Sequence, residues 1–452
     1  MPAPKVLNMD EILSVDEPAR TMRKNLISMA MAGIEAVMPE NLIPSVLARK
    51  GDALTVNGNN GPLSFDLSSY DRIHLAGAGK ASAEMGKAVA GIIGDLTEGG
   101  HINGIEDGEI PVGGGKVSLK RAGHPVPDEN SIEGSRKILD IFSSSGKKDL
   151  IIFLLSGGAS AMLSLPAEGI EKEKLAELTN ALLKSGASIQ EINCVRRHIS
   201  QVKGGRLAAM TEATVLTLII SDVVGNQLES IGSGPTAADP TTYADARAVM
   251  KKYGLDGRFP SVMEALDPRN ETVKPGDPKM KRVQNIIIAD NRTAVKAMEK
   301  VAEERKCRFT AFYDITGDVD AVSKKLAGEC NPPGLCLGGG EMTVEVSGSG
   351  KGGRCQEFVL RLFPNGYRGI ALAIGSDGLD GNSGAAGGVF DNAAMKMAVE
   401  MGLSLEEFLK ESDSYSLLSR LKTAISTGPT GTNVGDLYVM LPFGKSDAEK
   451  SP

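Results

Sequence analysis

The sequence predicts an α/β fold with two domains, a larger N-terminal Rossmann-like doubly wound sheet and a smaller C-terminal α/β domain. Two patterns predict it. Apolar runs of strand length alternate with stretches in which apolar residues recur at helical spacing, the signature of α/β proteins. In addition, many of the 54 glycines among the 452 residues cluster directly after apolar runs. Glycine turns at strand ends are where doubly wound sheets bind ligands.

The expected strands are apolar runs that end in small or acidic residues. Most of the first six are continuously apolar rather than alternating, as buried strands of a parallel sheet are. The runs are Arg72–Ala76, Leu150–Leu155, Val215–Ile220, Val283–Ala289, Arg308–Tyr313, Leu335–Leu337, Gly369–Ile374 and Leu437–Leu441. The sequence therefore predicts a mostly parallel sheet.

Amphipathic helices are expected between these runs. In one example Thr293, Val295, Met298 and Val301 follow three- and four-residue spacing, beside charged residues on the opposite face. The expected helices are Lys80–Ile93, Ser131–Phe142, Glu171–Lys184, Thr293–Lys306 and Asn392–Met401.

A proline-rich stretch is the expected domain boundary. Residues 254–281 contain Pro260, Pro268, Pro275 and Pro278 and little apolar periodicity. We therefore expect an N-terminal domain over residues 1–255, a linker over 256–282 and a C-terminal domain over 283–452.

Charge and composition exclude several classes of protein. Lys and Arg number 50 against 57 Asp and Glu, a net charge of −7, which argues against an extended nucleic-acid surface. Five cysteines without a CxxC pair indicate neither a disulfide framework nor a structural zinc site. No signal pattern and no apolar window of about 18 residues is found. We expect a cytoplasmic protein with free thiols and no nucleic-acid or membrane partner, either a monomer or a homodimer.

The first glycine cluster, residues 75–82, contains Gly79 and Lys80 and ends in Ser82. Glycine allows the backbone to approach a phosphate or carboxylate closely, and a lysine at the helix start adds a cation. The cluster is not a Walker A loop, because Ala81 follows the lysine where Ser or Thr is required. The alternative interpretation of this cluster is a tight turn that packs the strand against the helix, with the lysine on the surface.

Two further clusters predict anion binding in the N-terminal half. Ser156-Gly157-Gly158-Ala159-Ser160 follows the most apolar run and could form a nest of amide donors or a simple tight turn. Residues 192–206 are strongly basic, and on a helix that reaches the Gly204-Gly205 break Arg196, Ser200 and Lys203 share one face. This pattern indicates an anion pocket or a solvated helix face. Arg197 and His198 would point elsewhere, with His198 structural or exposed.

Two carboxylates at strand ends are candidate metal ligands. Asp222 follows one apolar run and Asp377 another. Magnesium is held at such positions by one or two carboxylates together with substrate phosphates. Alternatively, each aspartate could cap a helix or form a turn instead of binding a metal ion.

A basic, glycine-rich corner is expected in the C-terminal half. Gly338-Gly339-Gly340-Glu341 follows a short strand, and Lys351 and Arg354 lie among glycines at an expected helix start. Anion-binding corners in both halves predict a two-sided phosphate site.

Ten motifs, in order and spacing, resemble the class II glycerate kinases of the MOFRL family. The resemblance runs from about Arg20 to Leu441. The motifs are Ala76–Ser82, Gly123–Asp128, Ser156–Ser160, Asn193–Leu207, Ser221–Val223, Gly232–Thr236, Gly338–Glu341, Gly353–Glu357, Gly375–Gly381 and Gly428–Thr432.

The resemblance implies ATP-dependent phosphorylation of D-glycerate, with 2-phosphoglycerate and ADP as products and the active site in an interdomain cleft. The family's functional lysine and arginine match Lys80 and Arg354. One would hold the glycerate carboxylate and the other would neutralise the γ-phosphoryl group. Formation of 3-phosphoglycerate, a sugar-phosphate phosphatase or isomerase, and a non-catalytic metabolite-binding regulator are the alternatives.

The expected catalytic residues are Lys80, Arg354 and Asp222, with Asp222 and Asp377 as ligands of Mg²⁺ or another divalent cation. The residues expected to bind substrate or phosphate are Gly79, Ser82, Ser156, Gly157, Gly158, Ser160, Asn193, Arg196, Lys203, Gly339 and Glu341.

Overall fold

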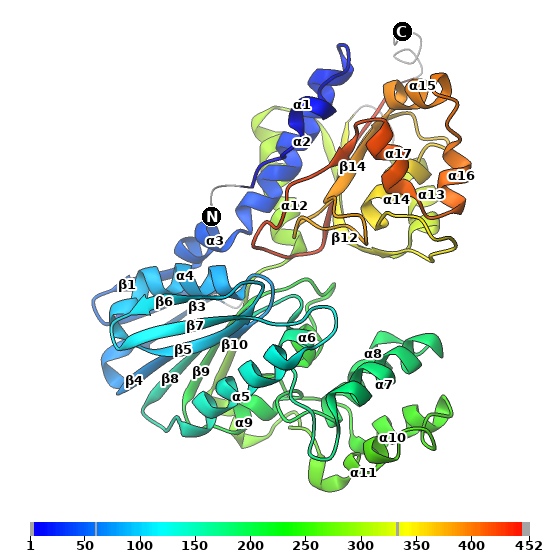
Figure 1. The fold of residues 1–452 in the computed structure, drawn as a ribbon. Helices are drawn as coiled ribbons and strands as arrows, with labels where there is room; N and C mark the ends of the chain where they lie inside the picture. The colour runs from blue at the N-terminus through cyan, green and yellow to red at the C-terminus, as the bar shows by residue number, and fades with distance from the viewer. Residues whose placement is uncertain (1–3, 59–60, 331–333, 445–452) are drawn as a thin grey trace. The chain divides into compact units, whose positions relative to one another are not determined.

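The computed structural model describes residues 4–58, 61–330 and 334–444. The chain forms two compact units (Figure 1). The Rossmann-like unit comprises Leu42–Ile288, and the C-terminal unit comprises Met1–Asn41 together with Ala289–Pro452. Each unit is described by itself.

The predicted domain boundaries are corrected at both ends of the N-terminal domain. Residues 1–41 belong to the C-terminal unit, because helix α2 (Ala19–Ala36) packs on strands of that unit. Residues 256–282 are not a linker, since they and most of β10 (Val283–Ala289) belong to the Rossmann-like unit. Within that unit, β10 is hydrogen-bonded to β9 (Thr214–Ile220).

The Rossmann-like unit is built on a seven-stranded sheet in the order β10-β9-β8-β4-β5-β7-β6. The remaining strands are β8 (Asp149–Ser156), β4 (Arg72–Ala78), β5 (Thr97–Gly104), β7 (Gly115–Arg121) and β6 (Gly108–Val112). Neighbours from β9 to β7 run parallel, and β6 is antiparallel to β7. The predicted doubly wound, mostly parallel sheet is confirmed, and its strand order reverses between β4 and β8.

Helices cover both faces of this sheet. Alternate residues of β8 point to opposite faces, so Phe153 packs on Phe142 of α5 (Glu129–Ser144), with ring centroids 5.6 Å apart. Leu154 instead approaches Gly86 of α4 (Ser82–Ile93). The other helices of the unit are α3 (Pro39–Val46), which begins in the preceding segment, α6 (Ala159–Met162), α7 (Lys172–Lys184), α8 (Ile189–His198), α9 (Arg206–Ala209), α10 (Tyr243–Lys252) and α11 (Pro260–Ala265).

A separate three-stranded sheet precedes the large one in sequence. It consists of β1 (Leu47–Lys50), β2 (Ala53–Gly58) and β3 (Gly61–Asp66), paired antiparallel. The sequence did not predict it, because its strands are short and carry charged or polar residues on their exposed positions.

The C-terminal unit contains a six-stranded sheet in the order β11-β12-β16-β13-β14-β15. The strands are β11 (Phe309–Asp318), β12 (Leu335–Thr343), β16 (Asp436–Pro442), β13 (Gly369–Gly375), β14 (Gly387–Asp391) and β15 (Ala424–Ile425). β11 and β12 pair in parallel, and the other neighbouring strands pair antiparallel. Its helices are α1 (Met9–Ile12), α2, α12 (Asn291–Glu304), α13 (Val319–Glu329), α14 (Arg354–Arg361), α15 (Asn392–Glu400), α16 (Leu405–Lys410) and α17 (Ser414–Arg420).

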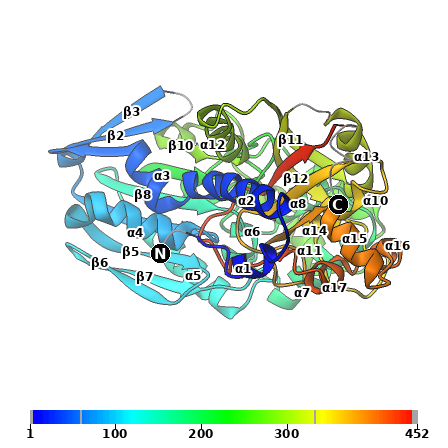
Figure 2. The same cartoon turned by 90° about the horizontal axis from the view of Figure 1, so that it is seen from above.

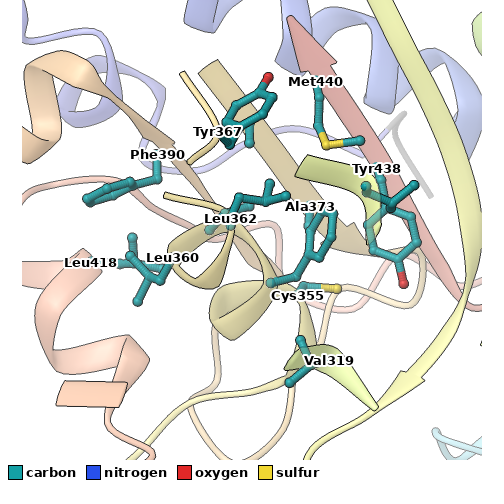
Figure 3. Close-up of a cluster of buried hydrophobic side chains, with 14 of the residues drawn as sticks. Val319, Cys355, Leu360, Leu362, Tyr367, Ala373, Phe390, Leu418, Tyr438 and Met440 are labelled. Carbon is teal, nitrogen blue, oxygen red and sulfur yellow. The ribbon is translucent and has the colours of Figure 1, made fainter. Parts of the chain in front are cut away.

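The alternation of side chains in β16 organises the core of the C-terminal unit. Tyr438 and Met440 join the cluster formed with α13, α14 and α17 (Figure 3). Leu437 points to the opposite face, where it approaches Gly33 of α2, beside α12 (Figure 2). The sheet is therefore covered on both faces, and one cover comes from the N-terminal segment.

The cysteines differ from the prediction. Cys330 and Cys336 form a disulfide between the end of α13 and the start of β12, with their Cα atoms 6.0 Å apart. Cys194 and Cys355 are buried thiols, and Cys307 is an exposed thiol. An odd number of cysteines without a CxxC pair does not exclude one disulfide across six residues.

No single helix in the described part of the chain is long and apolar enough to cross a membrane. Helices α2 and α3 reach the required length and composition only when taken together, and they are bent by 51° relative to each other.

A buried ion pair fastens the N-terminal segment to the C-terminal unit. Arg23 of α2 donates from Nε and Nη2 to the two carboxylate oxygens of Asp391, at 2.8 and 2.9 Å, and from Nη1 to the carbonyl of Ile12. The side chains of Arg23 and Asp391 are 3% and 4% exposed. Asp391 also accepts the backbone N–H of Ala394 and so caps α15.

Replacing Arg23 should therefore destabilise the C-terminal unit. In Arg23→Ala, Asp391 remains buried without its cation, at a cost of about 3–5 kcal/mol. For a unit of this size we expect the melting temperature to fall by roughly 6 °C or more in calorimetry. Arg20→Ala, on the exposed face of the same helix, is the control and should melt within about 2 °C of the wild type. Equal melting of both variants would contradict the anchoring role.

Candidate functional site

The glycine turns after β4 and β8 meet where the strand order reverses. The backbone N–H of Lys80 donates to the carbonyl of Gly157 at 2.9 Å, and the N–H of Gly79 donates to the carbonyl of Asn103 at 3.1 Å. Gly79 has φ +133°, and a Cβ built on it would lie 2.3 Å from the hydroxyl of Ser156. Only glycine fits there, so the two turns lock together and fix where Lys80 leaves the backbone.

Ser82 and Ser156 hold this turn rather than a ligand, which corrects their predicted role. Both are fully buried. The hydroxyl of Ser156 accepts the N–H of Ala81 at 3.0 Å and lies 3.2 Å from the hydroxyl of Ser82, which donates to the carbonyl of Leu154. The backbone N–H groups of Gly79, Lys80 and Ala81 likewise donate to acceptors within the protein.

Gly158 lies between the side chains of Lys80 and His124. A Cβ built on Gly158, which has φ +86°, would lie 3.2 Å from Cγ of Lys80 and 3.1 Å from Cδ2 of His124. The sequence marked His124 only as part of the Gly123–Asp128 motif and gave it no role. In the structure this motif contributes the side chain of His124 to the site. A residue larger than glycine at position 158 would displace that side chain.

A pocket of about 350 Å³ opens beside this turn within the Rossmann-like unit. Four residues predicted to bind substrate or phosphate line it, namely Gly158, Ser160, Arg196 and Lys203. Ser200 also lines it, so Arg196, Ser200 and Lys203 come together in one pocket, although not on one helix face as predicted. The helix that carries Arg196 ends at His198, however, and not at the Gly204-Gly205 break.

Residues that the sequence did not single out form the rest of the pocket. They come from the 124–127 loop, from the segment after α6, and from α7 and the end of α8. These residues are His124, Pro125, Val126, Pro127, Ala161, Ser164, Leu165, Leu175, Ala176, Leu178, Thr179, Asn180, Leu182 and Ile199. The spacing of apolar residues in α7 predicted an amphipathic helix. That spacing could not show that part of the apolar face of α7 lines a cavity.

Arg196 and Lys203 are cations in this pocket without a carboxylate partner among the described residues. Lys203 is 5% exposed, and its ammonium group donates to the carbonyls of Ser160 and Leu163, at 2.7 and 3.0 Å. Burial lowers the pKa of Arg196, and burial together with the nearby Arg196 lowers the pKa of Lys203 to about 7. Because unpaired charges are costly to bury, an anionic ligand would stabilise the charged forms of this pair.

Arg197 and His198 point away from the pocket, as predicted. Arg197 pairs with Asp239, with Nε 2.9 Å from Oδ2, and His198 lies between the carbonyl of Cys194 and the carboxylate of Glu271, at 2.8 and 2.9 Å. Both hold α8 in place. Asn193 is buried on α8 and does not line the pocket, and its contact with substrate stays a prediction.

Asp222 leaves the sheet beside the second glycine turn. Ile220, the last residue of β9, pairs with Ser156, so the loop containing Asp222 emerges next to Gly157-Gly158. Asp222 is half-buried. Asp222 therefore lies at the same sheet edge as Lys80, and its catalytic and metal-binding roles stay predictions.

The C-terminal unit brings its predicted residues to one edge of its sheet. Strand β16 runs antiparallel to both β12 and β13, and its first residue, Asp436, pairs with Gly340 and with Gly375. The carboxyl ends of β12 and β13 therefore lie on either side of Asp436. Glu341 lies near the carboxyl end of β12, and Asp377 follows two residues after the end of β13.

Arg354, the first residue of α14, is held at this edge by two carboxylates. Its Nε and Nη2 donate to Asp436 at 2.6 and 3.1 Å, and its Nη1 donates to Glu341 at 2.7 Å. Burial disfavours the charged guanidinium, but Asp436 and Glu341 outweigh it and raise the pKa of Arg354. The side chain of Asp436 is 1% exposed and that of Glu341 is 44% exposed. An incoming anion would therefore compete with Glu341.

Asp380 is a residue of this edge that the sequence did not select. It is buried and accepts the backbone N–H groups of Cys355 and Gln356, at 3.1 and 2.9 Å, so it fixes the start of α14 next to Arg354. Burial raises the pKa of this carboxyl. The sequence feature that could have identified Asp380 is its position in the Gly375–Gly381 motif, three residues after Asp377.

Gly339 and Asp377 have local structural contacts. A Cβ built on Gly339 would lie 2.1 Å from Oδ1 of Asn291 in α12, so this glycine serves helix packing, which corrects its predicted ligand contact. Asp377 accepts the N–H of Leu379 at 3.0 Å, as a turn-forming aspartate does.

A metal ion at this site would depend on few protein ligands. No group of three or more His, Cys, Asp or Glu side chains is placed to hold a metal ion within residues 4–58, 61–330 and 334–444. Magnesium often takes one carboxylate and completes its shell with water and phosphate oxygens. Asp222 offers such a carboxylate at the edge that bears Lys80.

The fold and these residues define a two-unit α/β protein with cations and glycine turns at its strand ends. Two family models match the chain, a domain of unknown function (DUF4147) over residues 25–267 and the MOFRL family over residues 334–436. The chain therefore belongs to the family of glycerate 2-kinases that combines these two domains, as its relatives also show.

Those relatives span nearly the whole chain. Glycerate 2-kinase of Pyrococcus horikoshii is 35% identical over 94% of this chain and 98% of its own, and D-glycerate 2-kinase of Thermotoga maritima is 36% identical over 93% and 98%. A putative hydroxypyruvate reductase of Agrobacterium vitis is 35% identical over 82% of this chain and 87% of its own. The crystal structure of glycerate kinase from Thermotoga maritima matches with a TM-score of 0.79 at 34% identity, over 94% of this chain and 100% of that one.

The environment of Lys203 predicts a lysine that titrates near neutrality. Its pKa of about 7 makes it charged below that pH and uncharged above it. In NMR spectra of protein with ¹³C-labelled lysine, we expect one side-chain signal with a midpoint near pH 7. Lys203→Met should remove that signal, and Lys184→Met, at an exposed position of α7, should leave it. Titration of every lysine signal above pH 9 would contradict the environment described here.

Proposed function

We propose that this protein is an ATP-dependent D-glycerate 2-kinase. The observation that carries the proposal is the similarity to proteins named glycerate 2-kinase over more than nine-tenths of the chain. The site chemistry supports it, because both units place cations and glycine turns at strand ends, as phosphoryl transfer requires.

In the proposed reaction, the 2-hydroxyl oxygen of D-glycerate attacks the γ-phosphorus of ATP. The bond from that phosphorus to the bridging oxygen of ADP breaks, and the hydroxyl proton passes to whichever of Asp222 and Asp377 does not hold the metal ion. A magnesium ion would neutralise phosphate charge, with Asp222 as its protein ligand. Lys80 and Arg354 supply the cations, one for the phosphoryl group and one for the glycerate carboxylate.

The contacts of Arg354 limit how it can act. Asp436 occupies the Nε and Nη2 side of the guanidinium and is itself buried, so this pair orients the side chain. The Nη1 side pairs with the exposed Glu341 and is the side that a substrate anion could take over. Glu341 would then act as a partner that substrate displaces.

The reaction and its two cations can be tested together. With ATP, Mg²⁺ and D-glycerate, phosphorus NMR should show 2-phosphoglycerate formed in step with ADP. Lys80→Ala removes a cation and Arg354→Lys keeps the charge but loses the bidentate geometry, so each should lower kcat at least about a hundredfold.

The controls for this test are exposed cations close to each site. Lys87→Ala on α4 and Lys351→Ala before α14 should stay within about threefold of wild-type activity, because both side chains lie on the exposed surface. A 3-phosphoglycerate product would overturn the regiochemistry. ATP-independent turnover, oxidation of NADH with hydroxypyruvate, or binding without turnover would each overturn the kinase proposal.

The role of Asp222 predicts a change in magnesium dependence. Asp222→Asn keeps the size of the side chain but loses its charge. We expect the Mg²⁺ concentration for half-maximal activity to rise by about tenfold or more, as measured by titrating Mg²⁺ at saturating ATP. Asp377→Asn is the matched comparison and should leave this concentration unchanged. The reverse result would move the metal role to Asp377.

A further inference from the structure

Strand β5 buries two polar side chains beneath α5. His101 and Asn103 are two residues apart on the strand, so they point to the same face, and they are 3% and 0% exposed. Ile102, between them, points to the other face and approaches Gly86 of α4. Polar side chains at such positions are costly unless their donors and acceptors are paired. The partners of His101 and Asn103 therefore decide what the two side chains do for the protein.

Asn103 bonds to three segments around the candidate site. Its backbone carbonyl accepts the N–H of Gly79 at 3.1 Å, in the turn that carries Lys80. Its side-chain Nδ2 donates to the carbonyl of Met162, the last residue of α6, at 2.8 Å. Nδ2 also lies 3.4 Å from the carbonyl of Ser131, in the first turn of α5. One residue thus joins the first glycine turn, the helix after the second glycine turn and the start of α5.

Two of these segments carry residues that line the pocket. Helix α6 supplies Ser160, and the 124–127 loop supplies all four of its residues. The hydroxyl of Ser131 accepts the N–H groups of Gly123 and Asp128, at 3.0 and 3.1 Å, so it holds both ends of that loop. A shift of the first turn of α5 would therefore shift the loop.

His101 fixes the orientation of the Asn103 amide. Because Nδ2 of Asn103 faces carbonyl oxygens, Oδ1 faces His101, whose Nε2 lies 3.0 Å away. Nε2 must then carry a proton, since Oδ1 can only accept. The other ring nitrogen, Nδ1, lies 2.6 Å from the hydroxyl of Ser118 and accepts its proton when the ring is neutral. Burial lowers the pKa of His101 and so favours the neutral ring.

Helix α5 approaches these side chains at a glycine. A Cβ built on Gly134 would lie 1.8 Å from Oδ1 of Asn103, so any other residue would push the amide away from His101 or the helix away from the sheet. Glycine inside a helix lowers helix stability relative to alanine. Here it leaves the space in which the amide keeps its orientation.

We infer that Asn103, oriented by His101, is a positioning residue for phosphoryl transfer. It holds the turn of Lys80, helix α6 and the 124–127 loop in one arrangement. Neither His101 nor Asn103 lines the pocket, so both act through the segments that Asn103 joins. This inference rests on the proposed kinase function, because the arrangement matters for a reaction in which small misplacements of the reacting groups are costly.

The first test compares kcat with KM in Asn103→Leu, which keeps the size of the side chain and removes its hydrogen bonds. We expect kcat to fall at least about tenfold, whereas KM for ATP and for D-glycerate should change by no more than about threefold. All groups that contact substrate are still present in this variant, and only their alignment is lost. Phosphorus NMR of the product gives the rates.

The second test asks whether His101 acts through Asn103. His101→Gln keeps an N–H donor for Oδ1 and should stay within about twofold of wild-type kcat, whereas His101→Leu removes the donor and should lose at least about fivefold. In the double variant His101→Leu/Asn103→Leu, kcat should equal that of Asn103→Leu within about twofold, because two residues that act through one amide are not additive.

A matched control loses a buried hydrogen bond elsewhere in the same unit. Thr211 is 3% exposed and donates to the carbonyl of Ser145, before β9 and β8 begin and thus at the opposite edge of the sheet. Thr211→Val should lower the melting temperature and leave kcat within about twofold of the wild type. If Asn103→Leu melts more than about 5 °C below Thr211→Val, the comparison of His101→Gln with His101→Leu decides.

The possible results separate this inference from the proposed function. Wild-type kcat in Asn103→Leu, equal losses in His101→Gln and His101→Leu, or losses that multiply in the double variant each overturn the inference and leave the kinase activity standing. A wild-type protein that forms no phosphoglycerate overturns both. The orientation of the amide is tested without activity, by ¹⁵N NMR of histidine-labelled protein at neutral pH. His101 should be protonated on Nε2 and not on Nδ1, and a proton on Nδ1 would overturn the inference.

Discussion

The close contact between the turns after β4 and β8 is the constraint on which the candidate site depends. At Gly79 a side chain would collide with Ser156, and the hydroxyls of Ser82 and Ser156 bond to each other and to the backbone instead of to a ligand. The hydroxyls inside this contact are thus hydrogen-bonded within the protein. Its outer surface carries Lys80 and Gly158, and the pocket, the 124–127 loop and the Asp222 loop are all arranged around it.

The sequence predicted the repetitive part of the fold well, because burial on both faces leaves a direct pattern. Continuous apolar runs marked β8 and β9, and helical spacing marked α7 and α12. The domain division could not be predicted in this way. That α2 covers the C-terminal sheet depends on contacts such as Gly33 with Leu437 and Arg23 with Asp391, which join positions far apart in the chain and leave no local periodicity.

The site was predictable to the extent that its residues stand in charged or glycine-rich motifs. Arg196, Lys203 and Gly158 could be selected because their residue types are unusual at those positions, and the structure brings them into one pocket. Ser82 and Gly339 belong to the same kinds of motif but serve packing, since a motif does not show which way a side chain points. Leu175 and Thr179 gave no signal, because a pocket wall and a packed helix face share one pattern.

The two units bury their cations in opposite ways, and this difference bears on how a kinase site would divide its substrates. Arg354 is surrounded by Asp436 and Glu341, so its positive charge is already balanced and only the exchange of Glu341 for another anion is open to it. That arrangement suits a singly charged carboxylate, which replaces one acid by another at little electrostatic cost. Arg196 and Lys203 have no such partners among the described residues, so the pocket beside them gains most from a ligand with several negative charges. For the proposed kinase, this charge balance favours the polyphosphate at the Rossmann-like unit and the small acid at Arg354.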